Sequence, residues 1–550
     1  MLDRDALAAV LAGALWMLHP LFISTTLYVV QRESMLAASF VLLGFLAWLA
    51  GRARYERGAR RAGVALLVVG SIACTGLAML CKANGVLLPL LLLVAEGTVL
   101  PPVAGEPGEA FRRLRRGLLV LPCALLVAGL VLKLPGAIEL AREVRPWTLG
   151  ERLLSEPRVI LDYLRLLLVP RPLAGGIFQD GFPVSTSLLR PWTTLPAILL
   201  LAGLAVFAWR QRMRWPLVAF ALLFFLAGHA LEGSIVPLEL YFEHRNYLPA
   251  MPLFWPLGCW LVAAGRLATP RFCAAVALLA LLAFDTRIGA SIWGQPARLA
   301  QEWAARDPAS SRAQATAAQY ELLLGRPGAA RARLRTALAA RPDDAQLAFN
   351  LADAECAIGA LQPDVLPAIH YALETSPNSA RLGFDWLSRA VTLAKTGTCP
   401  GLDLDVVASM LMALRSNPRF ATVPARQLDF MHIEGLLALA RGDSRAALAA
   451  FDRGIAILPR ASTALRQAAL LATAGDPDLG LRHLDRYGRL PQPARRPWPT
   501  MAHLHAWLLQ RDGYWERELG RLRAQLAEDV AAMHPAPGAP QASASGHDDG

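Results

Sequence analysis

The chain has 550 residues, of which 55% are hydrophobic and only 18% are charged, and its mean hydropathy is +0.37. These values exclude an ordinary soluble protein and indicate a membrane protein. The net charge of +12 comes largely from arginines in short loops between apolar runs. No zinc-ligand spacing, RNA-binding motif or separate basic stripe accompanies this charge, so we expect no nucleic-acid partner. No CxxC pair is present, and we expect no metal site.

Nine apolar segments precede residue 285, and each predicts a membrane helix. They are 6–18, 35–50, 62–80, 86–100, 117–132, 195–209, 217–231, 253–264 and 272–284. Several are shorter than the roughly 20 residues that a span needs, so flanking residues or tilt must complete them. The first is expected to act as an uncleaved signal anchor. The sequence therefore predicts an all-α chain in which residues 1–290 form a polytopic membrane domain.

Arginines follow every even-numbered segment and predict the orientation of the chain. They are Arg52, Arg54, Arg57, Arg60, Arg61, then Arg112, Arg113, Arg115, Arg116, then Arg210, Arg212, Arg214, and finally Arg266 and Arg271. The positive-inside rule places these four loops in the cytoplasm. We therefore expect a cytoplasmic N-terminus in a bacterial inner membrane, with everything after residue 284 in the periplasm. The outer segment 151–168, "ERLLSEPRVILDYLRLLL", has helical periodicity and suits a helix in the membrane interface.

Prolines divide the C-terminal part into helical units. Helical runs are expected to end at Pro342, Pro377, Pro418, Pro459 and Pro491, at intervals of 32 to 41 residues. In the unit that ends at Pro459, Gly435, Ala447 and Phe451 occupy the small, small and aromatic positions of a tetratricopeptide (TPR) repeat. The sequence thus predicts a TPR-like α-solenoid over 300–532, with a protein partner on its surface. The low-complexity tail 535–550 is predicted to be disordered.

Two cysteines, Cys356 and Cys399, occur in this C-terminal part. Their separation of 43 residues is close to one repeat, and the periplasm permits oxidation, so they could meet as a disulfide. Two free buried thiols are the alternative.

Polar clusters converge on the predicted outer face. The residues expected to bind the phosphate of a lipid are Arg32, Lys82, His244 and Arg245. The residues expected to support them are Glu243, Asn246, Tyr247 and Asp180. Arginine grips phosphate in a bidentate way and lysine adds a point charge, so this set suits a phosphate-headed lipid.

Each of these residues also has a structural alternative. Arg32 and Lys82 could simply extend toward the membrane surface. Glu243, His244 and Arg245 could form a salt-bridge knot that closes the loop. Tyr247 could be an interface residue, and Asp180 could serve a turn.

The stretches "HPL…LYVVQRESMLA", "CKANGVLLPLLLL" and "PLELYFEHRNYLP", with the trailing repeats, resemble bacterial membrane proteins with C-terminal TPR repeats. These are related to type IV pilin glycosylation enzymes and, more distantly, to eukaryotic transmembrane-and-TPR O-mannosyltransferases. The resemblance implies a GT-C-type glycosyltransferase that transfers a sugar from a polyprenyl-phosphate carrier, a membrane lipid, to an acceptor on the outer face. Lys82 matches the lysine of a Ser-Lys-Glu motif, whereas Ala83 or Asn84 replaces the acid.

The start of the chain departs from this family pattern. GT-C proteins commonly have eleven spans and a catalytic acid in the first outer loop, whereas nine spans are predicted here and the first outer loop begins at His19-Pro20. The first membrane hairpin and its acid are therefore expected to be missing, through a truncation or a late start, and the catalytic residue stays unassigned. A non-catalytic TPR scaffold of the envelope and a polymerase or ligase of lipid-linked glycans are the alternatives.

Overall fold

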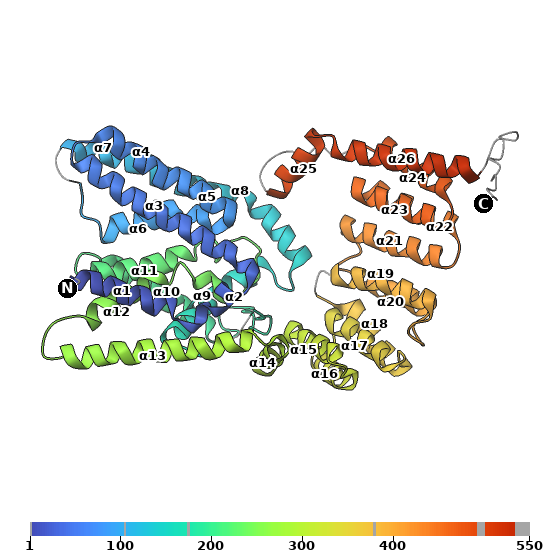
Figure 1. Cartoon of the computed structure of the whole chain (residues 1–550), viewed down its shortest axis with the longest axis horizontal. Helices are drawn as coiled ribbons and strands as arrows, with labels where there is room; N and C mark the ends of the chain where they lie inside the picture. Colours follow the sequence, from blue (N-terminus) through green and yellow to red (C-terminus); the bar gives the residue numbers. More distant parts are fainter. Residues whose placement is uncertain (1–2, 104–105, 173–176, 378–380, 492–500, 534–550) are drawn as a thin grey trace, which may run out of the picture. The chain divides into compact units, whose positions relative to one another are not determined.

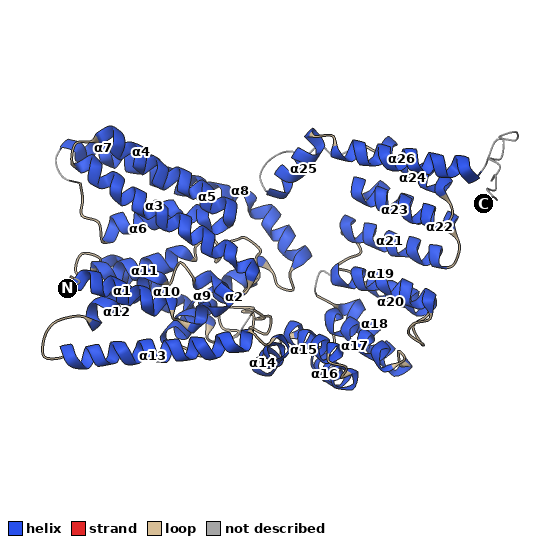
Figure 2. Cartoon of the chain, in the orientation of Figure 1, coloured by secondary structure: helices blue, strands red, loops and turns tan. Residues whose placement is uncertain are grey.

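The computed structural model describes residues 3–103, 106–172, 177–377, 381–491 and 501–533. All regular elements among these residues are helices (Figure 2). The chain divides into two compact units, residues 1–321 and 322–550 (Figure 1). The helices α14 (Pro296–Arg306) and α15 (Ser311–Leu323) therefore group mainly with the apolar helices, although they follow the last predicted span. The predicted disordered tail 535–550 lies outside the described residues.

All nine predicted apolar segments coincide with helices, but only some of these are long enough to span a membrane. Five described helices are long and apolar enough to cross a membrane: Val29–Glu56, Arg60–Cys81, Gly108–Arg142, Thr194–Gln211 and Ala268–Trp293. A sixth results if the pair Arg4–Met17 and Pro20–Leu27, bent by 54°, is one span. Pro20 explains the bend, because it lacks the N–H group that a continuous helix needs. The remaining three, Ala83–Thr98, Pro216–Gly228 and Met251–Leu261, are shorter.

The first unit contains two apolar cores that share α11 (Pro216–Gly228). One core packs residues of α1 (Arg4–Met17), α9 (Leu149–Leu168), α12 (Phe254–Leu261) and α13 (Ala268–Trp293). The other packs residues of α3 (Arg32–Glu56), α5 (Cys74–Cys81), α6 (Leu88–Thr98), α7 (Glu106–Arg115) and α8 (Leu121–Val144). Phe225 of α11 belongs to the first core and Phe224 to the second, so α11 joins them.

The contact between α3 and the next apolar helix is made backbone to backbone. A Cβ atom at Gly51 would lie 2.9 Å from the Gly63 carbonyl oxygen, and one at Gly44 would lie 2.8 Å from the Gly70 carbonyl oxygen. Glycine pairs of this kind are typical of helices that associate within a membrane.

One arginine of the predicted first cytoplasmic loop lies inside the protein. Arg52 belongs to α3, and its Nη1 lies 2.8 Å from Glu96 Oε1. Trp48 Nε1 donates to the same carboxylate oxygen at 2.9 Å. Arg52 therefore fixes α3 against α6, whereas Arg57 and Arg60 of the same run are exposed.

The second unit consists of helices that contact their neighbours along the chain (Figure 1). They are α16 (Pro327–Ala340), α17 (Ala345–Ile358), α18 (Leu366–Thr375), α19 (Arg381–Thr396), α20 (Leu404–Ser416), α21 (Pro424–Ala440), α22 (Ser444–Ile457), α23 (Ala461–Thr473), α24 (Pro477–Arg489), α25 (Met501–Arg511) and α26 (Tyr514–Met533). A Cβ at Gly435 of α21 would overlap the Phe451 ring of α22. The absence of a side chain at Gly435 therefore lets α21 and α22 pack closely.

The five prolines that were predicted to end helical runs do follow helix ends. Pro342, Pro377, Pro418, Pro459 and Pro491 each lie two residues after the last residue of α16, α18, α20, α22 and α24. A proline cannot donate the next backbone hydrogen bond and restricts the residue before it, so each helix ends there.

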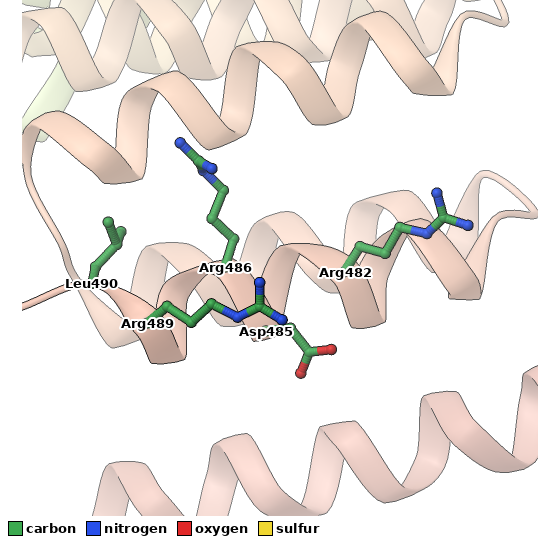
Figure 3. A pocket seen from close by; sticks show the side chains of 5 residues that line it. All are labelled: Arg482, Asp485, Arg486, Arg489 and Leu490. Carbon is green, nitrogen blue, oxygen red and sulfur yellow. The ribbon is translucent and has the colours of Figure 1, made fainter.

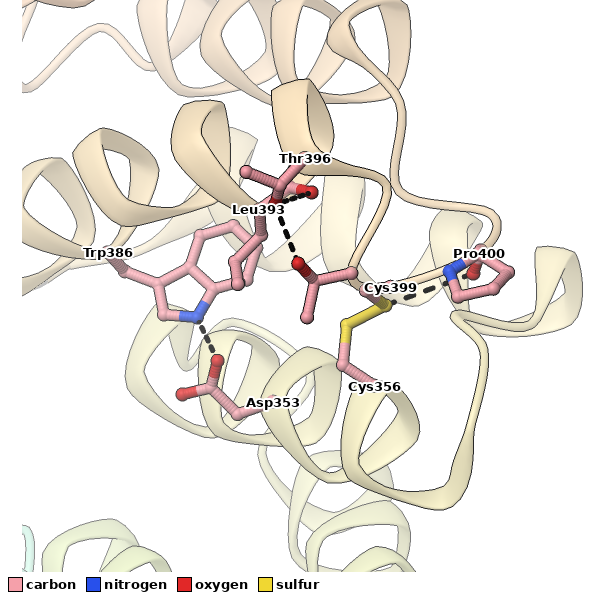
Figure 4. The surroundings of a disulfide bond; sticks show 8 residues. Asp353, Cys356, Trp386, Leu393, Thr396, Cys399 and Pro400 are labelled. Atoms are coloured by element: carbon pink, nitrogen blue, oxygen red, sulfur yellow. Dashed lines mark hydrogen bonds between the residues drawn. A yellow bond between two sulfur atoms is a disulfide. The ribbon is translucent and has the colours of Figure 1, made fainter.

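Cys356 and Cys399 form a disulfide, with their Cα atoms 5.1 Å apart (Figure 4). The bond links α17 to the segment that follows α19. Trp386 Nε1 of α19 donates to Asp353 Oδ1 of α17 at 2.6 Å, which is a second link between the same helices. The predicted bridge is therefore confirmed, and the alternative of two free thiols does not hold.

Candidate functional site

Three of the four predicted phosphate ligands come together in the structure. Lys82, His244 and Arg245 are close enough for the charges of Lys82 and Arg245 to act on the His244 ring. Arg32 is exposed at the start of α3, and it makes no ion pair or side-chain hydrogen bond among the described residues. Lys82 lies between α5 and the following short helix η4 (Ala83–Leu87), where its backbone is extended.

The ammonium group of Lys82 is held by the segment that opens α3. Its Nζ atom donates to Ser34 Oγ at 2.6 Å and to Gln31 Oε1 at 3.2 Å, and lies 3.5 Å from Glu33 Oε1. Burial lowers the pKa of Lys82, and the carboxylates of Glu232 and Glu33 oppose this change. Lys82 is therefore a fixed and largely buried amine, not one that extends freely toward solvent.

The stretch "YFEHRNYLP" is tied into the protein through its backbone and side chains. Tyr241 OH donates to Asp162 Oδ2 at 2.7 Å, and the Phe242 N–H donates to Tyr163 OH at 2.8 Å. Both acceptors belong to α9, so this helix holds the first half of the stretch in place.

The guanidinium of Arg245 points into its own loop. Nη1 donates to the Leu240 carbonyl at 2.8 Å, Nη2 donates to the Glu239 carbonyl, and Nε lies 3.5 Å from Glu232 Oε2. The side chain is only 3% exposed. This arrangement favours the salt-bridge knot that was the alternative for Arg245, although the carboxylate in the knot is Glu232 and not the predicted Glu243. Phosphate binding by Arg245 stays a prediction.

A second buried arginine–glutamate pair adjoins this knot, and the sequence interpretation missed it. Arg152 Nη2 lies 2.7 Å from Glu156 Oε1, and the guanidinium also donates to the carbonyls of Ser234 at 2.7 Å, Leu238 at 3.1 Å and Glu232. Burial raises the pKa of Glu156 to about 7, against the opposing effect of Arg152. We name Arg152, Glu156, Glu232 and Arg245 the buried charge cluster; each is at most 5% exposed.

In the sequence, this cluster was indicated only by the i,i+4 spacing of Arg152 and Glu156, which makes the two side chains neighbours on one face of a helix.

A small cavity lies beside the stretch that precedes Arg245. It is lined by Ser24, Tyr28, Gln31, Ile177, Phe242, Glu243 and His244, and its volume of about 20 Å³ is enough for about one water molecule. Ser24 Oγ donates to Glu243 Oε2 at 3.4 Å. The cavity therefore presents a carboxylate, a hydroxyl and an amide beside the Lys82 ammonium, which Gln31 contacts directly.

His244 is not a cation at this site. Its ring stacks on Phe242, with the ring centroids 5.0 Å apart. Burial, and then the charges of Lys82 and Arg245, lower the pKa of His244 to about 2. At neutral pH the imidazole is therefore uncharged, and it can offer a hydrogen bond to a ligand but no positive charge. Of the predicted cations, Lys82 is the one whose charged group donates a hydrogen bond to a residue of the cavity lining, Gln31, among the described residues.

The three other supporting residues serve the framework. Asn246 is fully buried, and its Nδ2 donates to the Glu243 carbonyl at 3.1 Å. Tyr247 packs on Trp16 with the ring centroids 4.8 Å apart. Asp180 accepts a hydrogen bond from Ser310 Oγ at 2.5 Å and lies 3.4 Å from Arg312 Nε, so it anchors the start of α15 and does not line the cavity.

The cavity lies at the N-terminal end of α3, whereas the exposed arginines Arg54 and Arg57 lie at its C-terminal end. The 25 residues of α3 rise by about 38 Å along the helix axis, which exceeds the hydrocarbon thickness of a bilayer.

Comparison of the chain with protein-family models, with curated proteins and with solved structures finds no match.

Proposed function

We propose that the chain is a membrane glycosyltransferase of GT-C type that takes a sugar from a polyprenyl-phosphate carrier and transfers it to an envelope protein such as pilin. The observation that supports this proposal is the convergence of Lys82, Glu243 and His244, from two remote parts of the chain, beside one cavity at the end of apolar helices. A fixed ammonium suits the carrier phosphate, while the acyl chain of the carrier needs an apolar surround.

In the proposed reaction, an acceptor hydroxyl oxygen attacks the anomeric carbon of the sugar. The bond from that carbon to the carrier phosphate breaks, and the hydroxyl proton passes to a carboxylate. Glu243 is the carboxylate that lines the cavity, and Ser24 orients it. Lys82 would hold the charge that develops on the leaving phosphate, and the neutral His244 would donate a hydrogen bond to the sugar or the phosphate.

The proposed location is a bacterial inner membrane, with the N-terminus in the cytoplasm and the second unit in the periplasm. Two observations support it. Arginines follow every second apolar segment, and the positive-inside rule assigns such loops to the cytoplasm. A disulfide joins Cys356 to Cys399, which fits an oxidising compartment. In that compartment the helix pairs of the second unit would act as a TPR-like array.

Replacing Lys82 with Met tests the proposal, because Met keeps most of the volume of the side chain and removes its charge. A charge-assisted contact is worth about 1.5 to 3 kcal/mol, so the Kd for a polyprenyl-phosphate sugar should rise about ten- to a hundredfold. The measurement is binding of the labelled donor to the purified full chain in lipid nanodiscs. Arg57→Met, at an exposed position on the far end of α3, is the control and should bind as the wild type does.

Wild-type donor binding by a folded Lys82→Met protein would contradict the proposal. It would favour a non-catalytic membrane scaffold, in which the second unit binds an envelope protein. A specific observation favours this second candidate: the cavity accommodates about one water molecule, and Arg245 and Asp180 are both engaged within the protein.

A further inference from the structure

A groove on the second unit carries three arginines on one helix. It has a volume of about 280 Å³ and is lined by Arg482, Asp485, Arg486, Arg489 and Leu490 (Figure 3). The arginines stand at positions i, i+4 and i+7 of α24, which places them along one face of the helix. At a rise of 1.5 Å per residue, the first and the last are about 10 Å apart along the axis. The groove is therefore an extended cationic surface and not a single point charge.

The ion pairs of these arginines are exposed and leave them open to another anion. Arg482 pairs with Asp478 at 2.7 Å and is 67% exposed, and Arg486 pairs with Asp452 at 3.6 Å and is 53% exposed. Arg489 is exposed and makes no ion pair among the described residues. Exposed pairs of this kind contribute little to stability, so a ligand can replace them at a small energetic cost.

A buried polar network lies behind the groove and ends at one of its arginines. Asp452, the partner of Arg486, also lies 2.7 Å from His483 Nδ1. His483 Nε2 lies 3.1 Å from Gln467 Oε1, and Gln467 Nε2 lies 3.4 Å from His432 Nδ1. His483 and Gln467 are fully buried. A polar network of this kind joins α21, α22, α23 and α24 and makes their core specific, and its surface end is the Asp452–Arg486 pair.

We propose that this groove binds an acidic segment of a protein partner through its side-chain carboxylates. The guanidinium fork matches a carboxylate in a bidentate way, and three forks spread over about 10 Å match carboxylates that are spaced along a peptide. Asp485 lies in the same groove, 2.8 Å from Arg523. Its negative charge disfavours a dense polyanion or an anionic membrane surface, whereas a peptide can place an uncharged or basic residue next to it.

The test uses the full chain in nanodiscs of neutral phosphatidylcholine. The probe is a fluorescein-labelled peptide of alternating Glu and Gly residues, and its matched peptide has Gln in place of Glu. Fluorescence anisotropy should show binding of the Glu peptide and none of the Gln peptide. The double variant Arg482→Gln/Arg489→Gln should bind the Glu peptide at least tenfold more weakly.

The control is the double variant Arg511→Gln/Arg521→Gln, which removes the same charge at side chains that are 61% and 77% exposed outside the groove. It should bind the Glu peptide as the wild type does. Equal weakening in both double variants, no binding by the wild type, or tighter binding of the wild type to phosphatidylglycerol vesicles than to the peptide would each overturn the proposal. All substituted side chains are exposed, and thermal unfolding checks that each variant is folded.

Discussion

Arg152→Ala should lower the free energy of unfolding by about 3 to 5 kcal/mol, because it removes one partner of a buried ion pair. The side chain is fully buried, pairs with Glu156, and donates to the carbonyls of Ser234, Leu238 and Glu232. Its removal leaves a buried carboxylate uncompensated and three carbonyl oxygens without this donor. The measurement is chemical denaturation of the full chain in detergent micelles.

The loss of unfolding free energy in Arg152→Ala should also depend on pH, and the direction of this dependence follows from the pKa of Glu156. Burial raises the pKa of this carboxyl from 4.5 to about 7 in the folded chain. A carboxyl whose pKa is raised on folding stabilises the protein below its unfolded pKa, and this contribution is lost as the pH rises through the folded value. The Arg152→Ala protein should therefore be less impaired at pH 5, where Glu156 is protonated, than at pH 8.

Two further variants separate this effect from a general loss of packing. Adding Glu156→Gln to Arg152→Ala should recover part of the stability at pH 8, because the neutral amide needs no cation. Arg165→Ala removes a 49% exposed arginine that pairs with Asp162 on the same helix, and it should cost under about 1 kcal/mol. A loss of the same small size for Arg152→Ala would show that the buried charge cluster does not stabilise the fold.

Loss of the disulfide should destabilise the second unit by about 2 to 4 kcal/mol, because the bond closes a long loop in the unfolded chain. Cys356 and Cys399 are separated by 43 residues. Cys356→Ala, Cys399→Ala and the double variant should lose the same amount, since each removes the same bond. Cys273→Ala, which changes an exposed free cysteine, is the control and should lose little.

Reductant provides an independent check of the disulfide. It should lower the stability of the wild-type chain to that of the Cys356→Ala/Cys399→Ala protein and leave the double variant unchanged. Labelling of Cys399 by a maleimide in the unfolded chain, without prior reduction, would contradict the bond.

The helix ends of the second unit could be predicted from sequence because their cause is local. Pro418, for example, follows α20 by two residues, and Pro459 follows α22 in the same way. Each proline acts on its own helix through its missing N–H group and its ring. The position of the helix end can therefore be predicted without knowing which distant residues the helix contacts. The close contact of Gly435 with Phe451 was predictable for a related reason, since the two helices are joined by a short turn.

Most polar partners of the buried charges could not be predicted, because they do not lie on the same helix. The helical pattern of 151–168 indicated an amphipathic helix, but it did not show that Arg152 and Glu156 would lie on the buried face of α9. Their polar partners include carbonyls about 80 residues further along the chain. Arg245 likewise pairs with Glu232 across a loop, where a nearer carboxylate, Glu243, had been expected.

The length of the apolar helices was only partly predictable. Hydropathy located all nine apolar segments, but a bend at Pro20 and three short helices reduce the number that can cross a membrane unaided to five, or six with the bent pair. Hydropathy measures how apolar a segment is, whereas spanning also depends on where the helix ends and bends.

The most direct test of the account asks which side of the membrane carries the candidate site. In the proposed topology, the cavity, the N-terminal end of α10 (Thr194–Gln211) and the disulfide lie on the side of the membrane opposite the arginine-rich loops. Single cysteines are introduced at two exposed positions, Ser187→Cys near the start of α10 and Ala59→Cys in the first arginine-rich loop, after the five free cysteines are replaced by alanine. A membrane-impermeant maleimide applied to bacterial spheroplasts should label Ser187→Cys and leave Ala59→Cys unlabelled until the membrane is opened. Labelling of Ala59→Cys in intact spheroplasts, with protection of Ser187→Cys, would contradict the account, because the cavity and the disulfide would then both face the cytoplasm.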